Sequence, residues 1–512
     1  MPSLALLRPV RLCALAALAA GLALTALAGP ASAGRSQESI MQDDQFLYTQ
    51  GPEAQARALD LMKELGVDTV HTLLTWRGLA PEPDAARQPK GFKADDPRSY
   101  PSDRWHPLDD AIRGAQARGM RILLTPTGPA PRWAEACSDS EESRYTPGTC
   151  RPSASKFGAF VKAAARRYSG VYTDERDGSR LPRISRWSLW NEPNQGGWLS
   201  PQTKRVSGRT VVVAAAAYRS LVYAGARGIA GAGHHRSDQI LLGETAPIGG
   251  NSSRSGPVPF YETLFCVDSR GRRLTGSVAR AAGCRSRMPR LDVDGIAHHP
   301  YTRGAGDPLY KRQASSSITI AYTSRLRRLG NLGVKTRMLS RTVPSRIYFT
   351  EFGVSSDPPG KRYSVPLDTQ AEWINQADYI AYRDSSVRSV AQYGLADDRS
   401  FGRDSFQTGL CFTPCYPKPA WDAYRLPLYV LDRRSSVSVF GQVRPGGTSS
   451  PSVQVQNRAT EDAPWQTVAT VEPGTNGYFL KTLPKREGSW RLAWTPTIGT
   501  TYFSREAVPR AK

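Results

Sequence analysis

Two glutamates occupy matching places in the chain, each directly after a short apolar run. Glu192 follows the apolar-alternating residues 184–189, and Glu351 follows residues 346–350. Runs of this kind predict short buried strands, so both carboxyl groups are expected at strand ends. Two such carboxyl groups have the chemistry to cleave a glycosidic bond, because one acid protonates the leaving oxygen while the other carboxylate attacks or stabilises the sugar.

The sequence around each glutamate resembles a known group. Asn-Glu-Pro at residues 191–193 and Thr-Glu-Phe-Gly at residues 350–353 are similar to the motifs of clan A retaining glycoside hydrolases. Families 5 and 39, with cellulase-like and xylosidase-like enzymes, are the nearest patterns. In that clan the first Glu ends strand four as acid/base and the second ends strand seven as nucleophile. The resemblance covers residues 39–430 and implies that Glu192 is the acid/base and Glu351 the nucleophile.

Further site residues follow from the same resemblance. Residues 298–301, His-His-Pro-Tyr, resemble the clan's His-x-Tyr element, whose Tyr hydrogen-bonds the nucleophile, and this maps His299 and Tyr301. Asn191 would donate to the sugar 2-hydroxyl, or would only shape the turn that follows it. Glu244, at the end of a predicted strand, would contact sugar hydroxyls or form a surface salt bridge.

A metal site is the competing hypothesis for the adjacent histidines. The carboxylates near them in sequence are only Asp292 and Asp294, which is a poor ligand set. No metal and no cofactor is therefore predicted.

Tryptophans are the expected sugar platforms, because indole faces stack on the apolar C–H faces of sugars. Four lie at or just past predicted strand ends: Trp76, Trp133, Trp190 and Trp198. Core packing is the alternative for each. Trp133 is the favoured platform because Pro131 holds it in a loop.

The chain departs from the family 5 pattern at two places. His71 stands where the strand-two Arg is expected, and Tyr393 with Gly394 where the strand-eight Trp is expected. These departures move the match towards family 39-like or unassigned clan members. They bear on the substrate more than on the chemistry.

The elements that position these residues form a repeating pattern of short apolar runs and longer amphipathic stretches. Eight strands are predicted, at residues 39–42, 69–74, 121–125, 186–190, 239–243, 293–297, 346–350 and 389–393. Eight strand–helix units predict a (β/α)8 TIM barrel, here expected over residues 34–431. Its active site would lie at the carboxyl ends of the strands, where both glutamates fall.

The pattern changes after Tyr429, where helical periodicity stops. Short alternating runs are predicted as strands at residues 436–440, 452–456, 465–471, 477–482 and 490–494. They predict a small β-sandwich over residues 432–512. It would either bury apolar barrel surface as a lid or bind carbohydrate.

The first 33 residues have the order of a secretory signal peptide. Arg8 and Arg11 precede the apolar residues 12–27, and Ala-Ser-Ala follows at residues 31–33. A membrane anchor is the alternative, which the short, Ala-rich apolar run disfavours. A secreted, extracellular protein without a stable anchor after cleavage is expected.

Cysteine usage agrees with export. Of seven cysteines, Cys13 leaves with the signal peptide, and the others form three close pairs: Cys137 with Cys150, Cys266 with Cys284, and Cys411 with Cys415. Six cysteines allow fifteen pairings, and closeness favours these three local disulfides. A metal site is disfavoured because no Cys-x-x-Cys occurs.

The formal net charge is +23. It reflects either a basic, solvated surface or attraction to an anionic matrix such as a uronate-bearing polysaccharide. No run of five basic residues occurs and aromatics do not interleave with basic residues, so nucleic-acid binding is not predicted. The expectation is a secreted O-glycoside hydrolase that cleaves a polysaccharide or oligosaccharide by double displacement. The rival hypothesis is a non-catalytic carbohydrate-binding or adhesion barrel, which would not need both glutamates. The sequence does not indicate an oligomeric state.

Overall fold

The computed structural model describes residues 37–511, except for residues 235–237, 251–252, 400–405, 446–450 and 498. The predicted signal peptide lies outside the described residues. Among the described residues, no helix is both long enough and apolar enough to cross a lipid bilayer.

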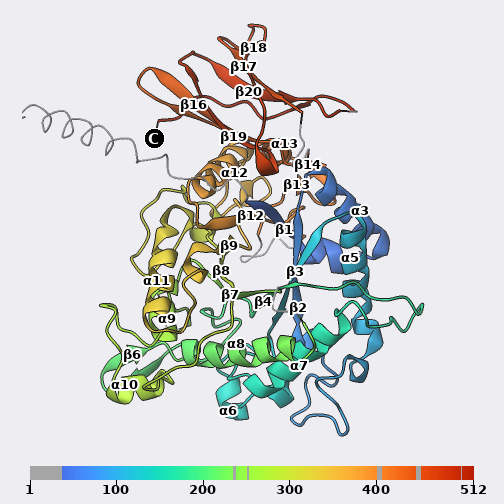
Figure 1. Cartoon of the computed structure of the whole chain (residues 1–512), viewed down its shortest axis with the longest axis vertical. Coiled ribbons are helices and arrows are strands. Elements are labelled where there is room, and N and C mark those ends of the chain that lie inside the picture. The colour runs from blue at the N-terminus through green and yellow to red at the C-terminus, as the bar shows by residue number, and fades with distance from the viewer. Residues whose placement is uncertain are drawn as a thin grey trace, which may run out of the picture.

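Eight parallel strands close into a barrel in the order β1-β12-β9-β8-β7-β4-β3-β2 (Figure 1). Their bounds are β1 (Glu38–Gln42), β2 (Thr69–Thr75), β3 (Arg121–Thr127), β4 (Arg186–Leu189), β7 (Gln239–Thr245), β8 (Gly295–His298), β9 (Ile347–Phe349) and β12 (Val387–Tyr393). Each overlaps one of the eight strands expected from the sequence. The (β/α)8 barrel is therefore confirmed, with the two glutamates just past its fourth and seventh strands.

Helices surround the barrel and follow its strands. The longer ones are α3 (Pro52–Glu64), α5 (His106–Ala117), α7 (Ala154–Arg167), α8 (Ala214–Ala230), α9 (Pro257–Leu264), α11 (Ser324–Lys335), α12 (Leu367–Tyr382) and α13 (Pro419–Arg425). Shorter ones are α2 (Asp44–Tyr48), α4 (Trp76–Leu79), α6 (Asp139–Glu142) and α10 (Gly276–Ala281). Helices α7 and α8 pack closely because Gly158 has no side chain; a Cβ there would lie 2.8 Å from the carbonyl oxygen of Ala224.

The barrel interior is layered along its axis, as the alternation of strand side chains requires. The middle layer is apolar and consists of Ile40, Leu123, Leu241, Ala297 and Tyr348. At the amino-terminal end, the carboxylate of Glu38 accepts hydrogen bonds from Arg186 and, at 2.7 Å, from Arg121. The carboxyl-terminal end holds the candidate site.

Two antiparallel sheets form the C-terminal β-sandwich, which stands above the barrel in Figure 1. One sheet contains β15 (Leu428–Asp432), β16 (Ser436–Gln442) and β19 (Tyr478–Pro484); the other contains β17 (Val453–Arg458), β18 (Gln466–Val471), β20 (Ser489–Trp494) and β21 (Tyr502–Phe503). The five predicted strands of this region are present. Since β15 pairs with β16, the sandwich sheet begins at Leu428, four residues before residue 432.

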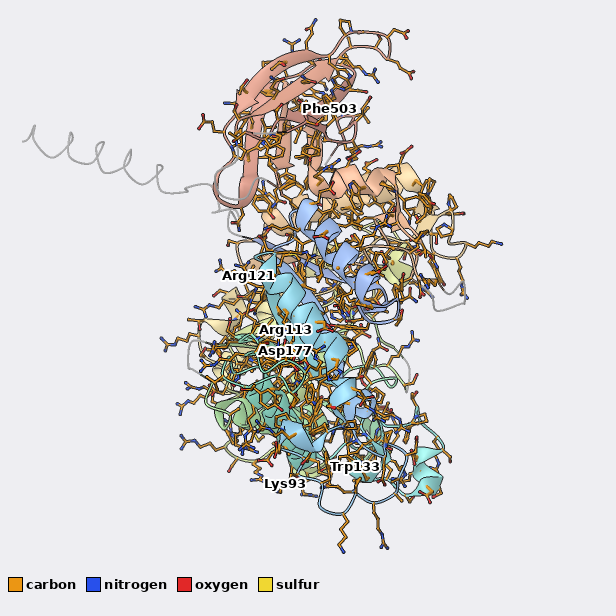
Figure 2. All side chains as sticks on the ribbon, turned by 90° about the vertical axis from the view of Figure 1, so that its right-hand side faces the viewer. Lys93, Arg113, Arg121, Trp133, Asp177 and Phe503 are labelled. Carbon is orange, nitrogen blue, oxygen red and sulfur yellow. A yellow bond between two sulfur atoms is a disulfide. The ribbon has the colours of Figure 1, made fainter. Side chains whose placement is uncertain are left out.

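The sandwich packs on α12 and on the amino-terminal end of the barrel. Buried Arg444 donates to Asp378 of α12 at 2.6 Å, and Tyr429 stacks on Tyr379 with ring centroids 5.4 Å apart. Asn476 donates to the carbonyl oxygen of Gln37, the residue before β1, at 3.0 Å. In Figure 2, Phe503 marks the sandwich, whereas Trp133, which follows β3, lies towards the opposite end of the molecule. These contacts agree with the first of the two alternatives for the sandwich, in which it buries barrel surface.

All three predicted disulfides are present. The Cα atoms are 5.9 Å apart for Cys137–Cys150, 5.7 Å for Cys266–Cys284 and 4.9 Å for Cys411–Cys415. Each distance falls within the usual range of about 4.4–6.8 Å.

Candidate active site

The carboxyl ends of β4, β8 and β9 bring the two glutamates together around one histidine. The Nδ1 atom of His299 lies 3.1 Å from Oε1 of Glu192 and 3.4 Å from Oε2 of Glu351. The hydroxyl of Tyr301 donates to Oε2 of Glu351 at 3.2 Å. The four residues expected to form the reacting centre therefore meet in space, although they come from three separate strands.

The shared histidine limits the spacing of the two carboxyl groups. The two oxygens that contact Nδ1 of His299 can be no farther apart than the sum of 3.1 and 3.4 Å. The separation in retaining enzymes, about 5–5.5 Å, lies inside the bound.

The turn after β4 is held in an unusual backbone conformation. Trp190 has φ +74° and Glu192 has φ +37°, values that residues with a side chain rarely adopt. Hydrogen bonds hold the turn: Asn191 N donates to Oγ1 of Thr127 at 2.9 Å, and Glu192 N donates to the carbonyl oxygen of Glu244 at 3.0 Å. Strain of this kind persists where the surroundings fix it, and it concentrates at functional sites.

Electrostatics couple the three central groups. Burial opposes the charged form of His299, but the carboxylates of Glu351 and Glu192 outweigh it and raise the pKa of the imidazole to about 9. Burial raises the pKa of Glu351 to about 7, while the charge of His299 acts in the opposite direction. The imidazolium thus lets two carboxyl groups stand close together in a buried place.

A second His–Glu pair lies deeper in the barrel. Nε2 of His71 is 3.1 Å from Oε1 of Glu244, and both side chains are fully buried. The other ring nitrogen of His71 contacts the carbonyl oxygen of Thr350, directly before Glu351, at 3.2 Å. Burial disfavours both charges, yet each partner stabilises the other, so the pKa of His71 is raised and that of Glu244 is lowered.

This geometry corrects both expectations for Glu244, because it contacts neither the cleft nor the surface. Its φ of +52° and the register shift between β7 and β8 at Gly243 and Thr245 turn the side chain into the barrel. From the sequence, His71 is distinguished only as a departure from a family pattern. The inward placement of His71 follows from strand alternation, but its partner depends on the bulge in another strand.

Three of the four predicted tryptophan platforms are wrong. Trp76 stacks on Phe160 with centroids 5.6 Å apart, and Trp190 packs edge-on against Phe157 at 5.1 Å. Trp133 is 4% exposed and donates from Nε1 to the carbonyl oxygen of Pro81 at 3.2 Å. The loop around Pro131 does hold Trp133, but it turns the ring into the core formed with α7.

The site opens into a cleft of about 1260 Å³. Asn191, Glu192, Trp198, Tyr301 and Glu351 line it, so one predicted tryptophan does reach the cleft. This volume exceeds the roughly 300–1,000 Å³ typical of pockets for drug-sized ligands, and it suits an extended ligand.

Three further aromatic residues line the cleft without having been predicted from the sequence: Tyr145, Tyr363 and Phe406. Tyr363 and Phe406 line the cleft and are 38% and 41% exposed. The ring of Phe406 lies 5.7 Å from that of Tyr301. The position of Tyr363 and Phe406 in the loops after β9 and β12 is the signal in the sequence that indicates them, because the rings of tyrosine and phenylalanine also stack on apolar faces.

Comparisons with known proteins find similarity among solved structures, at low sequence identity. No family model matches the chain, and no curated protein matches it. Among solved structures, a glucosidase from Croceicoccus marinus is 12% identical with a TM-score of 0.49, over 93% of this chain and 97% of that one. A family 39 glycoside hydrolase from Bacteroides cellulosilyticus is 13% identical with a TM-score of 0.48, over 88% and 80%. A GH30 endoxylanase from Clostridium papyrosolvens is 11% identical with a TM-score of 0.43, over 89% and 95%. At these values the functional argument rests on the site itself.

Proposed function

We propose that the protein is a secreted, retaining O-glycoside hydrolase that acts on a polysaccharide or oligosaccharide. The observation that carries this proposal is the meeting of Glu192 and Glu351 at Nδ1 of His299, in a cleft whose volume is large enough for a glycan. A barrel that only bound sugar would not need to hold two carboxyl groups so close together, one buried and one partly buried, because their mutual repulsion costs stability.

In the first step, Glu192 donates its proton to the glycosidic oxygen while a carboxylate oxygen of Glu351 attacks the anomeric carbon. The bond to the leaving group breaks, and a glycosyl ester forms on Glu351. Tyr301 hydrogen-bonds Oε2 of Glu351, which leaves Oε1 as the attacking atom and orients it. In the second step, Glu192, now a carboxylate, removes a proton from water as the water oxygen attacks the anomeric carbon. The ester bond to Glu351 breaks, Glu351 leaves as a carboxylate, and the sugar is released with retained configuration.

Asn191 is the proposed contact for the sugar hydroxyl next to the reacting carbon. It lines the cleft beside Glu192, and its side-chain oxygen has no hydrogen-bond partner among the described residues. A buried amide oxygen without a partner costs free energy, which a substrate hydroxyl that donates to this oxygen would recover on binding. Hydrogen bonds at this position strengthen in the oxocarbenium-like transition state.

An extracellular location is part of the proposal. The three disulfides are of the kind that persists in oxidising compartments, and residues 1–33 have the order of a signal peptide. The basic composition fits an anionic glycan in that environment.

Azide rescue tests the function and the two assignments together, after an active aryl-glycoside has been found by screening. In Glu351→Ala, activity should collapse, and azide should restore it from the vacated side, giving a glycosyl azide of inverted configuration. In Glu192→Ala, good leaving groups should still give the covalent intermediate, which accumulates because no base activates water. Azide then gives retained configuration.

The stereochemistry of the two rescues decides between the outcomes. Exchanged configurations would exchange the two assignments. If both variants kept wild-type activity, the hydrolase proposal would be wrong, and sugar binding without turnover would favour the non-catalytic barrel instead.

A further inference from the structure

The walls of the cleft carry an unusual set of cations. Four arginines line it, all of them exposed: Arg144, Arg254, Arg303 and Arg362. The carboxylates that line the same cleft are Asp44, Glu192 and Glu351, of which Asp44 accepts hydrogen bonds from Gln42 and Thr72. We refer to the four arginines as the arginine rim.

The arginine rim follows neighbouring strands of the barrel. Arg362, Arg303 and Arg254 lie in the segments after β9, β8 and β7, and Arg144 lies in the segment after β3. In the barrel order β9-β8-β7-β4-β3, the only strand of this arc without an arginine of the rim is β4, which presents Glu192. The cations therefore surround the predicted acid/base on both sides.

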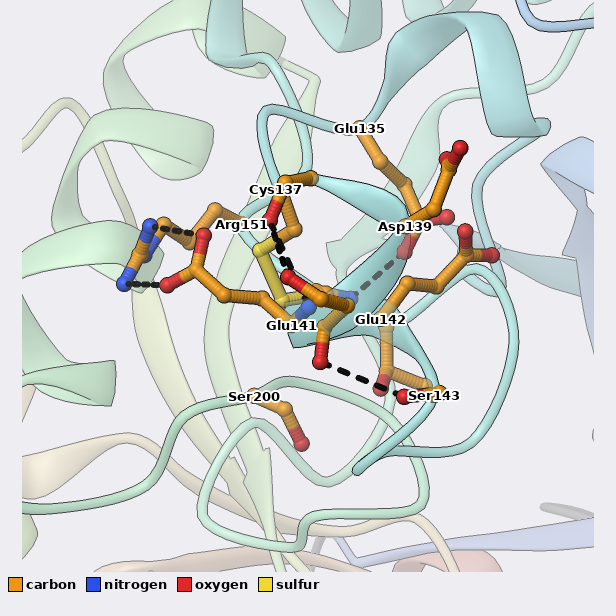
Figure 3. The surroundings of a disulfide bond; sticks show 12 residues. Glu135, Cys137, Asp139, Glu141, Glu142, Ser143, Arg151 and Ser200 are labelled. Carbon is orange, nitrogen blue, oxygen red and sulfur yellow. Dashed lines mark hydrogen bonds and ion pairs between the residues drawn. A yellow bond between two sulfur atoms is a disulfide. The ribbon is translucent and has the colours of Figure 1, made fainter.

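Within the described part of the chain, the guanidinium groups of the rim have no carboxylate within 4.0 Å. Arginines nearby behave differently. Arg151, in the same loop as Arg144, pairs with Glu141 at 2.9 Å, as Figure 3 shows. Arginines of the rim are thus available to an external anion, whereas their neighbour is neutralised within the loop.

Two members of the rim are held together around one aromatic ring. The guanidinium carbon of Arg362 lies 4.8 Å from the ring centroid of Tyr363, and that of Arg303 lies 5.9 Å from it. Arg362 also donates to the Tyr363 hydroxyl at 3.2 Å. Gly304 allows this contact, because a Cβ on it would collide with the tyrosine ring. Two like charges on one ring repel each other unless an anion joins them.

Backbone contacts fix the other two members. The disulfide Cys137–Cys150 closes the loop that carries Arg144 (Figure 3), and the next residue, Arg151, donates from its backbone N to the carbonyl oxygen of Ser200 at 2.9 Å. Arg254 pairs through its backbone with Gln195 in the segment after β4. Arg144 and Arg254 therefore each lie on a loop that hydrogen-bonds to the segment following Glu192.

We propose that the arginine rim binds the carboxylate or sulfate groups of an acidic polysaccharide, and that this class of polymer is the substrate. The inference that the cleft binds such anions depends only on the arginine rim. The inference that the polymer is also the substrate rests on the proposed function. Guanidinium groups fit both anions, since their N–H pairs match two oxygens in one plane. Four guanidinium groups along one cleft suit a polymer that bears repeated anionic groups. The anions would bind the arginine rim while a glycosidic bond lies at the two glutamates.

Binding to the full-length mature Glu351→Gln variant separates recognition from turnover. The probes are pectate, glucuronoxylan and alginate, each compared with its carboxyl-reduced form, and chondroitin sulfate compared with its desulfated form. At least one anionic polymer should bind about tenfold or more tightly than its uncharged partner at physiological ionic strength. Loss on carboxyl reduction identifies a uronate, and loss on desulfation a sulfate ester.

A matched pair of double variants locates the effect. Arg303→Ala with Arg362→Ala should weaken binding of that polymer about tenfold or more. Arg434→Ala with Arg486→Ala removes the same charge from exposed positions of the β-sandwich and should leave binding unchanged. Thermal unfolding of both confirms folding. In the otherwise wild-type enzyme, the rim variant should raise KM for the anionic polymer and leave kcat unchanged.

Two results would overturn the inference. Equal losses in both double variants would mean that bulk charge, not the rim, attracts the polymer. Equal binding of charged and neutral polymers would mean that the rim recognises no anion. If the wild-type protein bound the polymer tightly through the rim but did not hydrolyse it, the anion site would be kept and the proposed hydrolase rejected. If it hydrolysed only neutral glycans, the hydrolase would be kept and the anion site rejected.

Discussion

The two ends of the barrel each hold a charged cluster, but they balance charge in different ways. At the amino-terminal end, one carboxylate, Glu38, lies between Arg186 and Arg121, and these contacts outweigh burial and lower its pKa. At the carboxyl-terminal end, three glutamates share two histidines: Glu192 and Glu351 with His299, and Glu244 with His71. The first end relies on permanent cations and the second on titratable ones.

This difference separates stability from chemistry. An arginine stays charged at any ordinary pH, so the cluster at Glu38 is a fixed part of the fold. At the other end, burial raises the pKa of Glu351 to about 7, so the cluster at His299 changes its charge near neutral pH. The β-sandwich packs against the fixed end and leaves the titratable end open to the cleft.

The largest effect is expected at the titratable end. Glu351→Gln keeps the shape of the nucleophile but removes the attacking oxygen's charge, so kcat/KM should fall by at least about 10⁴-fold. The free energy of unfolding should stay the same or rise, because burial disfavours this carboxylate in the folded state. Steady-state kinetics and urea unfolding check both parts. If Glu351→Gln strongly lowered the free energy of unfolding, the charged cluster at the carboxyl-terminal end would stabilise the fold, as the cluster at Glu38 does, and the comparison would be wrong.

The opposite result is expected for Glu38→Gln. This substitution leaves Arg186 partly buried without its carboxylate, and breaking such a pair costs about 3–5 kcal/mol of unfolding free energy. Activity per folded molecule should be unchanged, since Glu38 lies at the other end of the barrel. Urea unfolding combined with active-site titration measures the two quantities. A variant of normal stability but low activity would contradict the comparison.

The pH profile gives a smaller but more specific effect. Glu351 must be ionised to attack, so kcat/KM should rise as pH increases through about 7, the pKa to which burial raises this group. In His299→Gln the imidazolium is lost, the pKa of Glu351 rises further, and this acidic limb should move upward by about one unit or more. Profiles measured with one aryl-glycoside show the shift. If the acidic limb of the pH profile did not move in His299→Gln, the imidazolium of His299 would not be what holds the pKa of Glu351 down.

The smallest effect concerns the contact between the β-sandwich and the barrel. Asn476→Gly preserves the backbone at φ +56° but deletes the hydrogen bond to Gln37, which should lower the free energy of unfolding by about 1 kcal/mol. Kinetics should not change, because the contact lies at the end opposite the cleft. A change in KM or kcat would show that the two ends communicate.

Local patterns were enough to predict the barrel strands and both glutamates. Apolar alternation over residues 69–74 or 239–243 is a property of the segment itself, and it located β2 and β7 almost to the residue. The motifs around Glu192 and Glu351 are equally local. The three disulfides joined cysteines close in sequence, so their pairing also needed no tertiary information.

Features that depend on contacts between distant segments could not be predicted in this way. Trp133 is buried because α7 and Phe92 pack around it, which the proline before it does not reveal. Glu244 turns inward because of a bulge between two strands. The arginine rim becomes a group only when four loops converge, since its members are spread over residues 144–362.

The disulfide Cys137–Cys150 has a consequence for the entropy of binding. It closes residues 137–150 along one wall of the cleft. Ser200 N donates to the carbonyl oxygen of Thr149 at 2.8 Å, which joins that segment to the loop after β4. A loop that is already ordered loses little conformational freedom when a glycan arrives, so more of the contact energy appears as affinity. Because the bridge fixes both ends of the segment, we expect that its inner sequence can be exchanged for that of another loop without disturbing the strands that hold the two glutamates.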